Sequence, residues 1–366
     1  MAYGIMGGVI GRRRTEPLEG DRSALARLVV AALAVALALT VMFSLDSGAS
    51  DASGWQFVLD ALYPSLDATL SMRDRVIMFD IRLPRVVLGV LVGASLAVSG
   101  AVMQGLFRNP LADPGLIGIS AGSSLAAVAV IVLGATFLAP LVLIFGSFAL
   151  PLAAFFGGLA TTLVLYRIST RQGRTSVATM LLAGIALAAM AMAFTGLLIF
   201  VADDRQLRDL TFWSLGSLSG ATWQKVGAVA PIMLLALAAT PFLARGLNAM
   251  ALGEATASHL GVPVQRLKYV AIVAVAASTG ASVAVSGGIG FVGIVVPHLL
   301  RLAIGPDNRF LLPASALLGA SLLLLADAVS RTIVAPAELP IGIVTAAAGA
   351  PFFLWILLRK RGVLDL

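Results

Sequence analysis

The sequence predicts an all-α polytopic membrane protein with ten transmembrane helices, and three observations support this fold class. Hydrophobic residues make up 59% of the chain and charged residues only 12%, whereas soluble domains average about 25% charged residues. Apolar stretches close to the roughly 20 residues that a bilayer-spanning helix needs recur along the whole length. These stretches are continuous rather than alternating, which disfavours a β-barrel.

The first apolar stretch, residues 28–45, is predicted to be a retained transmembrane helix. Arginines precede it as in a secretory signal, but its 18 residues exceed the roughly 7–15 of a signal's apolar region. Basic residues collect on the cytoplasmic side of membrane proteins. We therefore expect a basic cytoplasmic extension over residues 1–23 and an outer segment over residues 46–80.

Nine further spans follow along the chain. With the first included, their approximate bounds are 25–45, 84–106, 115–134, 141–166, 176–201, 224–243, 268–286, 291–304, 312–331 and 341–358. Ten spans place both termini in the cytoplasm, and most of the 25 basic residues then fall on the inner side. The net charge of +7 therefore reflects topology and anionic lipid, and nucleic acid is a poor match as a partner.

A short string of small residues occurs once in each half of the chain. GASLAVSG at 93–100 and GASVAVSG at 280–287 agree at seven of eight positions. Five spans separate them, so their helices run in opposite directions, as in the inverted repeats of transporters. This predicts one transmembrane domain, 24–366, with halves 24–215 and 216–366. Small residues also let helices pack closely in lipid. Gly93, Gly100, Gly280 and Gly287 can therefore belong to an inverted repeat and also serve close helix packing.

The loop after the second span carries helix-start signals. Asp113 suits the position that caps a helix N-terminus, and Pro114 suits the first helical position because its missing N–H costs nothing there. A tight inter-helix turn accounts for these residues.

The string RLPRVVLGVLVGASLAVSGAVMQGLFRNPLADPGLIGISAG, at 82–122, resembles the FecCD-type permease family. Its members are membrane subunits of bacterial ATP-driven importers for iron-siderophore complexes, haem and cobalamin. Further strings with this resemblance are FWSLGSLSGATW (212–223), ALGEATASHLGV (251–262), GGIGFVGIVVPHLLR (287–301), LLPASALLGASLLLLADAVSR (311–331) and AELPIGIVTAAAGAPFFLW (337–355).

The resemblance implies a type II ABC importer permease with ten helices per subunit, in the bacterial inner membrane. It implies a homodimer around a central translocation path, two cytoplasmic ATPase subunits and a periplasmic substrate-binding protein. The chain itself has no phosphate-binding G-x-x-x-x-G-K-[ST] loop, because none of its three lysines follows a glycine. We therefore expect ATP and Mg on the partner, no permanently bound cofactor or metal here, and a transport subunit rather than an enzyme.

The segment 248–264 is too polar to cross the membrane and lies on the predicted cytoplasmic side. Gly253–Glu254 opens a helix of about two turns, which Gly261 and Pro263 end. The segment fits an interfacial loop helix, and the resemblance assigns it the role of docking on the ATPase. The residues that this coupling role implicates are Leu252, Gly253, Glu254, His259, Leu260 and Gly261.

Three arginines lie on the predicted outer face, against the positive-inside bias. Arg82 and Arg85 begin the second span and Arg331 ends the ninth. They fit lipid headgroup contact, with Arg331 also paired to Asp327 one turn earlier. The resemblance instead implies that all three receive glutamates of the binding protein.

Two further positions concern the path of the cargo. Met103 and Gln104 are expected to face the translocation path or a helix interface. His298 follows Pro297 in the eighth span, and a structural hydrogen bond fits it better than haem ligation, because the same string occurs in members that carry no haem.

Three sequence strings, at 105–120, 205–223 and 304–320, most resemble those of the haem-type members. Haem is therefore the expected cargo, and ferric siderophore and cobalamin are the alternatives. From another class, a secondary transporter with inverted repeats would share the architecture. An intramembrane enzyme would need a reactive cluster of side chains, which the sequence does not show.

Overall fold

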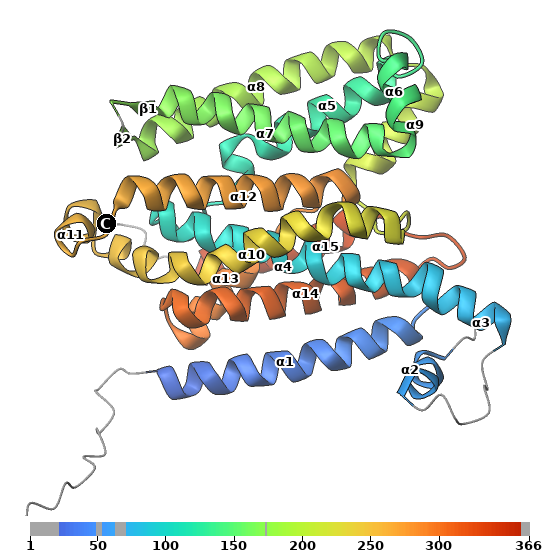
Figure 1. Ribbon diagram of the computed structural model, residues 1–366, viewed down its shortest axis with the longest axis horizontal. Coiled ribbons are helices and arrows are strands. Elements are labelled where there is room, and N and C mark those ends of the chain that lie inside the picture. The colour runs from blue at the N-terminus through green and yellow to red at the C-terminus, as the bar shows by residue number, and fades with distance from the viewer. Residues whose placement is uncertain (1–21, 49–52, 63–70, 173, 360–366) are drawn as a thin grey trace, which may run out of the picture.

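The computed structural model describes residues 22–48, 53–62, 71–172 and 174–359 of the 366-residue chain. Long helices lie side by side in a bundle, with α1 along one edge and α5, α7 and α8 along the opposite edge (Figure 1). The helices are α1 (Ser23–Asp46), α2 (Gly54–Leu62), α3 (Met72–Val76), the π-helix η1 (Ile77–Arg82), α4 (Leu83–Phe107), the 3₁₀ helix η2 (Pro114–Ile117), α5 (Ile119–Leu133), α6 (Ala139–Phe145), the 3₁₀ helix η3 (Gly146–Phe148), α7 (Ala149–Ser169), α8 (Val177–Val201), α9 (Asp204–Ser214), α10 (Trp223–Ala251), α11 (Glu254–His259), α12 (Val264–Ser286), α13 (Val292–Ile304), α14 (Asn308–Thr332) and α15 (Ile341–Arg359). Two short strands, β1 (Thr170–Arg171) and β2 (Arg174–Thr175), form an antiparallel hairpin between α7 and α8.

The membrane fold predicted from composition is confirmed. Within the described ranges, seven helical segments are long and apolar enough to cross a membrane, and three shorter apolar helices complete the set. The short ones are α5, α13 and the first part of α15, and together the ten match the ten predicted spans. The basic extension at 1–23 lies almost wholly outside the described residues.

The largest differences between the predicted and the observed helix boundaries occur at three places. The fourth predicted span breaks at Gly146, whose φ of +51° interrupts the helix between α6 and α7. Helix α10 continues to Ala251, eight residues past its predicted end, because the polar residues after 243 are compatible with a helix that leaves the membrane. On the other side, α3 and η1 extend α4 outward, so one helical run covers 72–107.

Helix α4 forms the centre of the bundle, and nearly all of it is buried. It packs along α14 and α13, while α12 packs along α7 and α5. Similarly, α5 pairs with α7, and α13 pairs with α14. The contacts among α4, α5 and α7 of the first half and α12, α13 and α14 of the second half therefore stay the same in kind when α4 is replaced by α12, α5 by α13 and α7 by α14. This is the contact pattern that an inverted repeat requires.

The repeated small-residue strings mark close approaches between helices. A Cβ at Gly93 would overlap the carbonyl of Gly319 in α14, and one at Gly100 would overlap the carbonyl of Gly293 in α13. Gly287, at φ +69°, ends α12 against the Trp213 carbonyl. These glycines let backbones touch. Gly280 differs, because a Cβ there would lie 3.5 Å from the Phe155 ring, an ordinary contact that leaves room for a methyl group.

Candidate functional site: two ion-pair clusters and a cavity between interrupted helices

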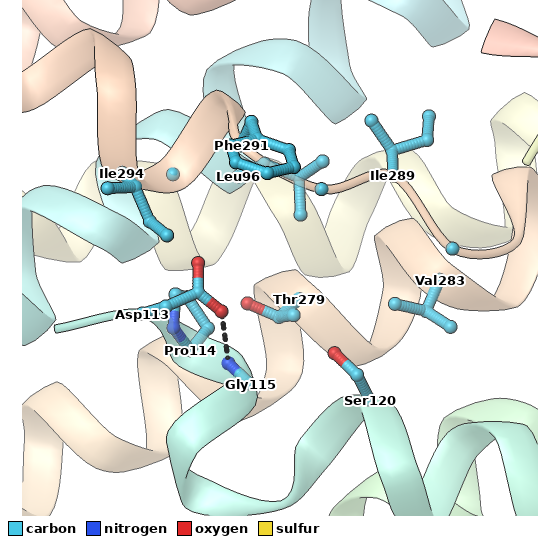
Figure 2. Close-up of a pocket in the computed structure, with 13 residues that line it drawn as sticks. Leu96, Asp113, Pro114, Gly115, Ser120, Thr279, Val283, Ile289, Phe291 and Ile294 are labelled. Atoms are coloured by element: carbon cyan, nitrogen blue, oxygen red, sulfur yellow. Dashed lines mark hydrogen bonds between the residues drawn. The ribbon is translucent and has the colours of Figure 1, made fainter. Parts of the chain in front are cut away.

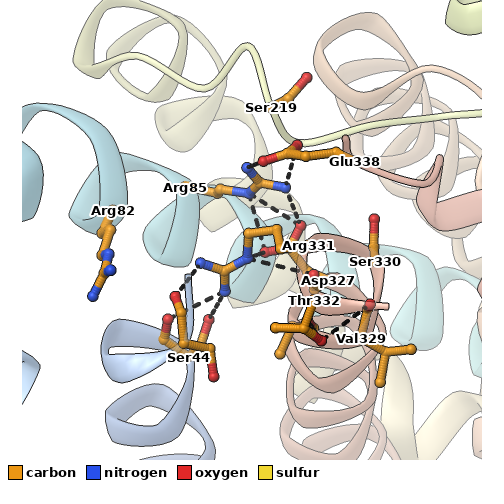
Figure 3. A network of polar contacts seen from close by, with 12 residues as sticks. Ser44, Arg82, Arg85, Ser219, Asp327, Val329, Ser330, Arg331, Thr332 and Glu338 are labelled. Atoms are coloured by element: carbon orange, nitrogen blue, oxygen red, sulfur yellow. Dashed lines mark hydrogen bonds and ion pairs between the residues drawn. The ribbon is translucent and has the colours of Figure 1, made fainter. Parts of the chain in front are cut away.

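Four charged side chains, which we call the outer cluster, meet where α4 begins and α14 ends (Figure 3). This end of the bundle is opposite α11 (Figure 1). Arg85 of α4 donates from Nε and Nη2 to Asp327 Oδ1, at 3.1 and 2.9 Å. It also donates from Nη1 and Nη2 to Glu338, at 2.8 and 3.0 Å. Arg331 completes the cluster with Nε 3.1 Å from Asp327 Oδ2. Two arginines share two carboxylates, so the cluster balances its own charge.

The outer cluster also fixes the end of α1. Arg331 donates to the carbonyls of Ser44 and Ser47, at 3.1 and 2.8 Å, and Arg82 donates to the carbonyl of Leu45 at 2.6 Å. The last carbonyls of a helix lack partners within that helix and carry partial negative charge, so cations are favourable there. The arginines therefore bind α1, α4 and α14 together.

The structure revises the expectation for these arginines. All three are buried in this chain, so the expected contact with lipid headgroups is wrong. The pair between Asp327 and Arg331 is confirmed. Docking of a partner on Arg82, Arg85 and Arg331 stays a prediction. Sequence reasoning missed Glu338, because it comes from the loop after α14 and lies 253 positions from Arg85.

A cavity of about 320 Å³ lies where α5 and α13 begin. Both helices are shorter than a full span, and each follows a segment broken by glycine or proline, 109–118 before α5 and 287–291 before α13. The two breaks occupy corresponding places in the two halves. Such paired interruptions are the best sequence indication of a transporter's binding site. The cavity is lined by Leu96, Asp113, Pro114, Gly115, Ser120, Thr279, Val283, Gly288, Ile289, Gly290, Phe291, Gly293 and Ile294.

The cavity is mostly apolar with three side chains of polar character (Figure 2). Asp113 accepts a hydrogen bond from the Gly115 N–H at 2.7 Å, so it caps η2 as predicted, although that turn is a 3₁₀ helix rather than the start of a long α-helix. Thr279 and Ser120 project their hydroxyls into the same space. Thr279 is 2% exposed, and its hydroxyl has no hydrogen-bond partner in the described part of the chain. Apolar walls with a few polar groups are typical of ligand sites.

Neither Met103 nor Gln104 lines this cavity. Both are fully buried in α4, and the Gln104 amide donates to the Ile294 carbonyl at 3.3 Å. Gln104 thus lies at the interface of α4 with α13, and Met103 packs in a core cluster with residues of α10 and α12. Both positions fit the second expected role, a helix interface, and a place on a translocation path stays a prediction. His298 is buried in α13 and lies away from the cavity lining.

The predicted short helix of the coupling segment is present as α11. Gly253, at φ +108°, precedes it, and Gly261, at φ +81°, follows it, so both ends use backbone angles that favour glycine. Leu252 and Leu260 are exposed at its two ends, and Leu260 is 63% exposed. His259 is exposed as well. The segment thus presents an exposed leucine to solvent at each end of α11.

A second cluster, which we call the inner cluster, lies beside α11 and was not predicted. Lys268 of α12 is 1% exposed. Its Nζ lies 2.6 Å from Glu254 Oε1 and donates to the Thr175 carbonyl at 2.8 Å. The sequence carries no local signal for this contact, because Thr175 lies 93 positions from Lys268.

The far end of α10 is fixed to α14 on the same side. The Asn248 amide donates to Asp307 at 2.7 Å and accepts from the Asn308 backbone at 2.8 Å. Burial acts to raise the pKa of the Asp307 carboxyl, but hydrogen bonds from Arg309 and Asn248 outweigh it and leave that pKa below its ordinary value. Asp307 is therefore held ionised as the N-cap of α14.

Interrupted helices that meet at a cavity, in corresponding places of two inverted halves, define a membrane transporter subunit. The chain belongs to the FecCD transport family, whose model matches residues 30–359. It is a multi-pass permease subunit of an ABC importer.

Three relatives illustrate this membership. The hemin transport system permease protein of Yersinia pestis is 47% identical over 285 residues, 78% of this chain and 84% of that protein. The cobalamin import system permease protein of Halobacterium salinarum is 41% identical over 348 residues, 95% of this chain and 91% of that protein. A solved metal-chelate type ABC transporter in an inward-facing conformation matches with a TM-score of 0.78 at 30% identity, covering 91% of this chain and 99% of that one.

Proposed function

We propose that this chain is the permease that moves haem across the bacterial inner membrane. The observation that carries this proposal is the largely apolar cavity between the two interrupted helices, which suits a flat, apolar cargo. The 47% identity to a hemin permease favours haem over the alternatives. Cobalamin is the second candidate, because a cobalamin permease matches a larger share of the chain at 41% identity. Ferric siderophore is the third.

The proposed complex contains two copies of this chain, two cytoplasmic ATPase subunits and a periplasmic binding protein. ATP and Mg bind the ATPase subunits, and this chain holds no permanent cofactor. Both termini are cytoplasmic, which places α11 on the ATPase side. The binding protein docks at the opposite end of the bundle, where Arg82, Arg85 and Arg331 lie and where Glu338 is partly exposed.

Uptake by the reconstituted complex tests the cargo. Proteoliposomes that contain the permease, its ATPase and its binding protein should accumulate haem in an ATP-dependent way. Unlabelled cobalamin and a ferric siderophore, each in excess, should leave haem uptake unchanged. ATP-dependent uptake of cobalamin without haem would overturn the assignment of haem. Gradient-driven uptake without the ATPase would indicate a secondary transporter.

The coupling role of α11 has its own test. Leu260→Asp places a charge at the exposed leucine that ends α11, and removing one buried apolar side chain from an interface there should weaken association by about 1–3 kcal/mol. We expect the variant to insert normally, to co-purify less ATPase and to transport poorly. Ala135→Asp, on the exposed turn between α5 and α6, is the control and should behave like wild type. Normal transport by Leu260→Asp would remove the docking assignment.

A further inference from the structure

Lys268 is a buried charge that joins two separate segments. Its ammonium group is enclosed among protein atoms, with its strongest contacts to Glu254 of α11 and to the backbone of Thr175 in β2. Burying a charge costs several kcal/mol unless good geometry offsets it, and an apolar side chain of similar volume often serves stability equally well. A buried lysine in this position therefore points to a role beyond packing.

Helix α11 packs on α10 and α12, and its Ala257 is fully buried in the hydrophobic core. It is only six residues long, and the chain that leads to α12 passes through Gly261 and Pro263. Gly261 adopts φ +81°, and a Cβ there would meet open space. The Lys268–Glu254 ion pair adds a charged side-chain link between α11 and α12.

The other acceptor of Lys268 belongs to the first half of the chain. Thr175 lies in the hairpin that connects α7 to α8, and α12 holds both of its backbone groups. Its N–H donates to Gln265 Oε1 at 2.9 Å, and its carbonyl accepts from Lys268 at 2.8 Å. Gln265 binds the hairpin independently of α11, whereas Lys268 binds the hairpin and α11 together.

We propose that Lys268 is a positioning residue that makes α11 and the β1–β2 hairpin move as one body, so that ATPase action on α11 reaches α7 and α8. This inference rests on the proposed docking of the ATPase at α11. A displaced α11 pulls Glu254, the ammonium follows its counter-ion, and the Thr175 carbonyl follows the ammonium. The pull thus crosses from the second half of the repeat to the first.

The test measures cargo transported per ATP hydrolysed in proteoliposomes. A smaller amount of folded protein lowers both rates together and leaves this ratio unchanged, whereas a broken link lowers the ratio alone. Lys268→Met retains the length and most of the volume of the side chain without the charge. We expect the ratio to fall by about tenfold, within the range typical of coupling between sites, while the ATPase still co-purifies. Lys268→Arg, which can still reach both acceptors, should keep the ratio within about twofold of wild type.

A second variant covers the case in which Lys268→Met fails to fold. Glu254→Gln keeps the lysine in place and weakens only its interaction with α11. It should therefore also lower the amount of cargo transported per ATP hydrolysed. If a complex of either variant with its ATPase transported as much cargo per ATP as wild type, the proposed link through Lys268 would be wrong, but the proposed function would stand. Transport by the wild-type permease without any ATPase would overturn the proposed function and this inference with it.

Discussion

The two ion-pair clusters lie at opposite ends of the bundle and differ in how firmly they are held. In the outer cluster, Asp327 is 0% exposed and contacts two arginines, and each arginine has a further acceptor. In the inner cluster, one lysine has two acceptors, and one of them, Glu254, is 41% exposed. In the outer cluster, each arginine keeps a further acceptor when one interaction is removed, whereas α11 loses its ion pair with α12 when the contact of Lys268 with Glu254 is removed.

The elements that each cluster joins differ in the same way. The outer cluster connects three long helices, α1, α4 and α14, that pack along one another through the bundle. The inner cluster connects a six-residue helix and a two-stranded hairpin to the start of α12. A redundant cluster between long helices acts as a static clamp. A single ion pair at a short exposed helix can instead transmit movement, or release it when the pair breaks. Four substitutions test this difference between the outer and the inner cluster.

The largest effect on stability is expected from Asp327→Asn. It leaves Arg85 and Arg331 buried with one carboxylate fewer, and breaking a buried pair costs about 3–5 kcal/mol. The free energy of unfolding in mixed detergent micelles measures this change. Asp209→Asn, at an exposed site of α9, is the matched control and should change little. Equal stability of the two variants would show that the outer cluster is not a clamp.

Glu254→Gln is expected to have a smaller effect on stability. Lys268 keeps the Thr175 carbonyl, and the new amide oxygen can still accept, so the cost should be about 1.5–3 kcal/mol, as for a hydrogen bond to a charged group. Its effect on the ratio of transport to hydrolysis should be large instead. A decrease in stability as great as that of Asp327→Asn would make the inner cluster a second clamp.

Glu338→Gln should cost less still, about 1 kcal/mol. Arg85 retains its bidentate contact with Asp327, and the Glu338 side chain is 37% exposed, so water screens the charge that the substitution removes. The free energy of unfolding in mixed detergent micelles again measures this change. If the variant were as unstable as Asp327→Asn, the redundancy of the outer cluster would be refuted.

The smallest effect is expected from Arg75→Ala. Its pair with Asp60 has a separation of 3.2 Å, but the arginine side chain is about half exposed. Surface pairs of this kind contribute about 0–1 kcal/mol, and the variant should unfold within about 1 kcal/mol of wild type. A larger change would mean that exposure is a poor guide to the strength of the pairs in this protein.

The sequence predicted the features that depend on local patterns. The spans follow from apolar length, α11 from its flanking glycines, and the Asp327–Arg331 pair from a separation of one helical turn. The contacts of Arg85 with Glu338 and of Lys268 with Thr175 could not be predicted, because packing alone brings such distant residues together. The cavity escaped prediction for the same reason, although Asp113 and its cap were recognised.

The central claim is that α11 and the hairpin form one moving unit. The chain contains no cysteine, so cysteines introduced at the exposed positions Ser258 of α11 and Arg171 of β1 can carry spin labels at defined sites. The distance distribution between the labels is then measured in the reconstituted complex, without and with ATP. When only one of the two copies of the chain carries the labels, the account predicts one narrow distribution, unchanged by ATP in the wild type and broadened by ATP in Lys268→Met. A wild-type distance that changes with ATP while transport continues would contradict it.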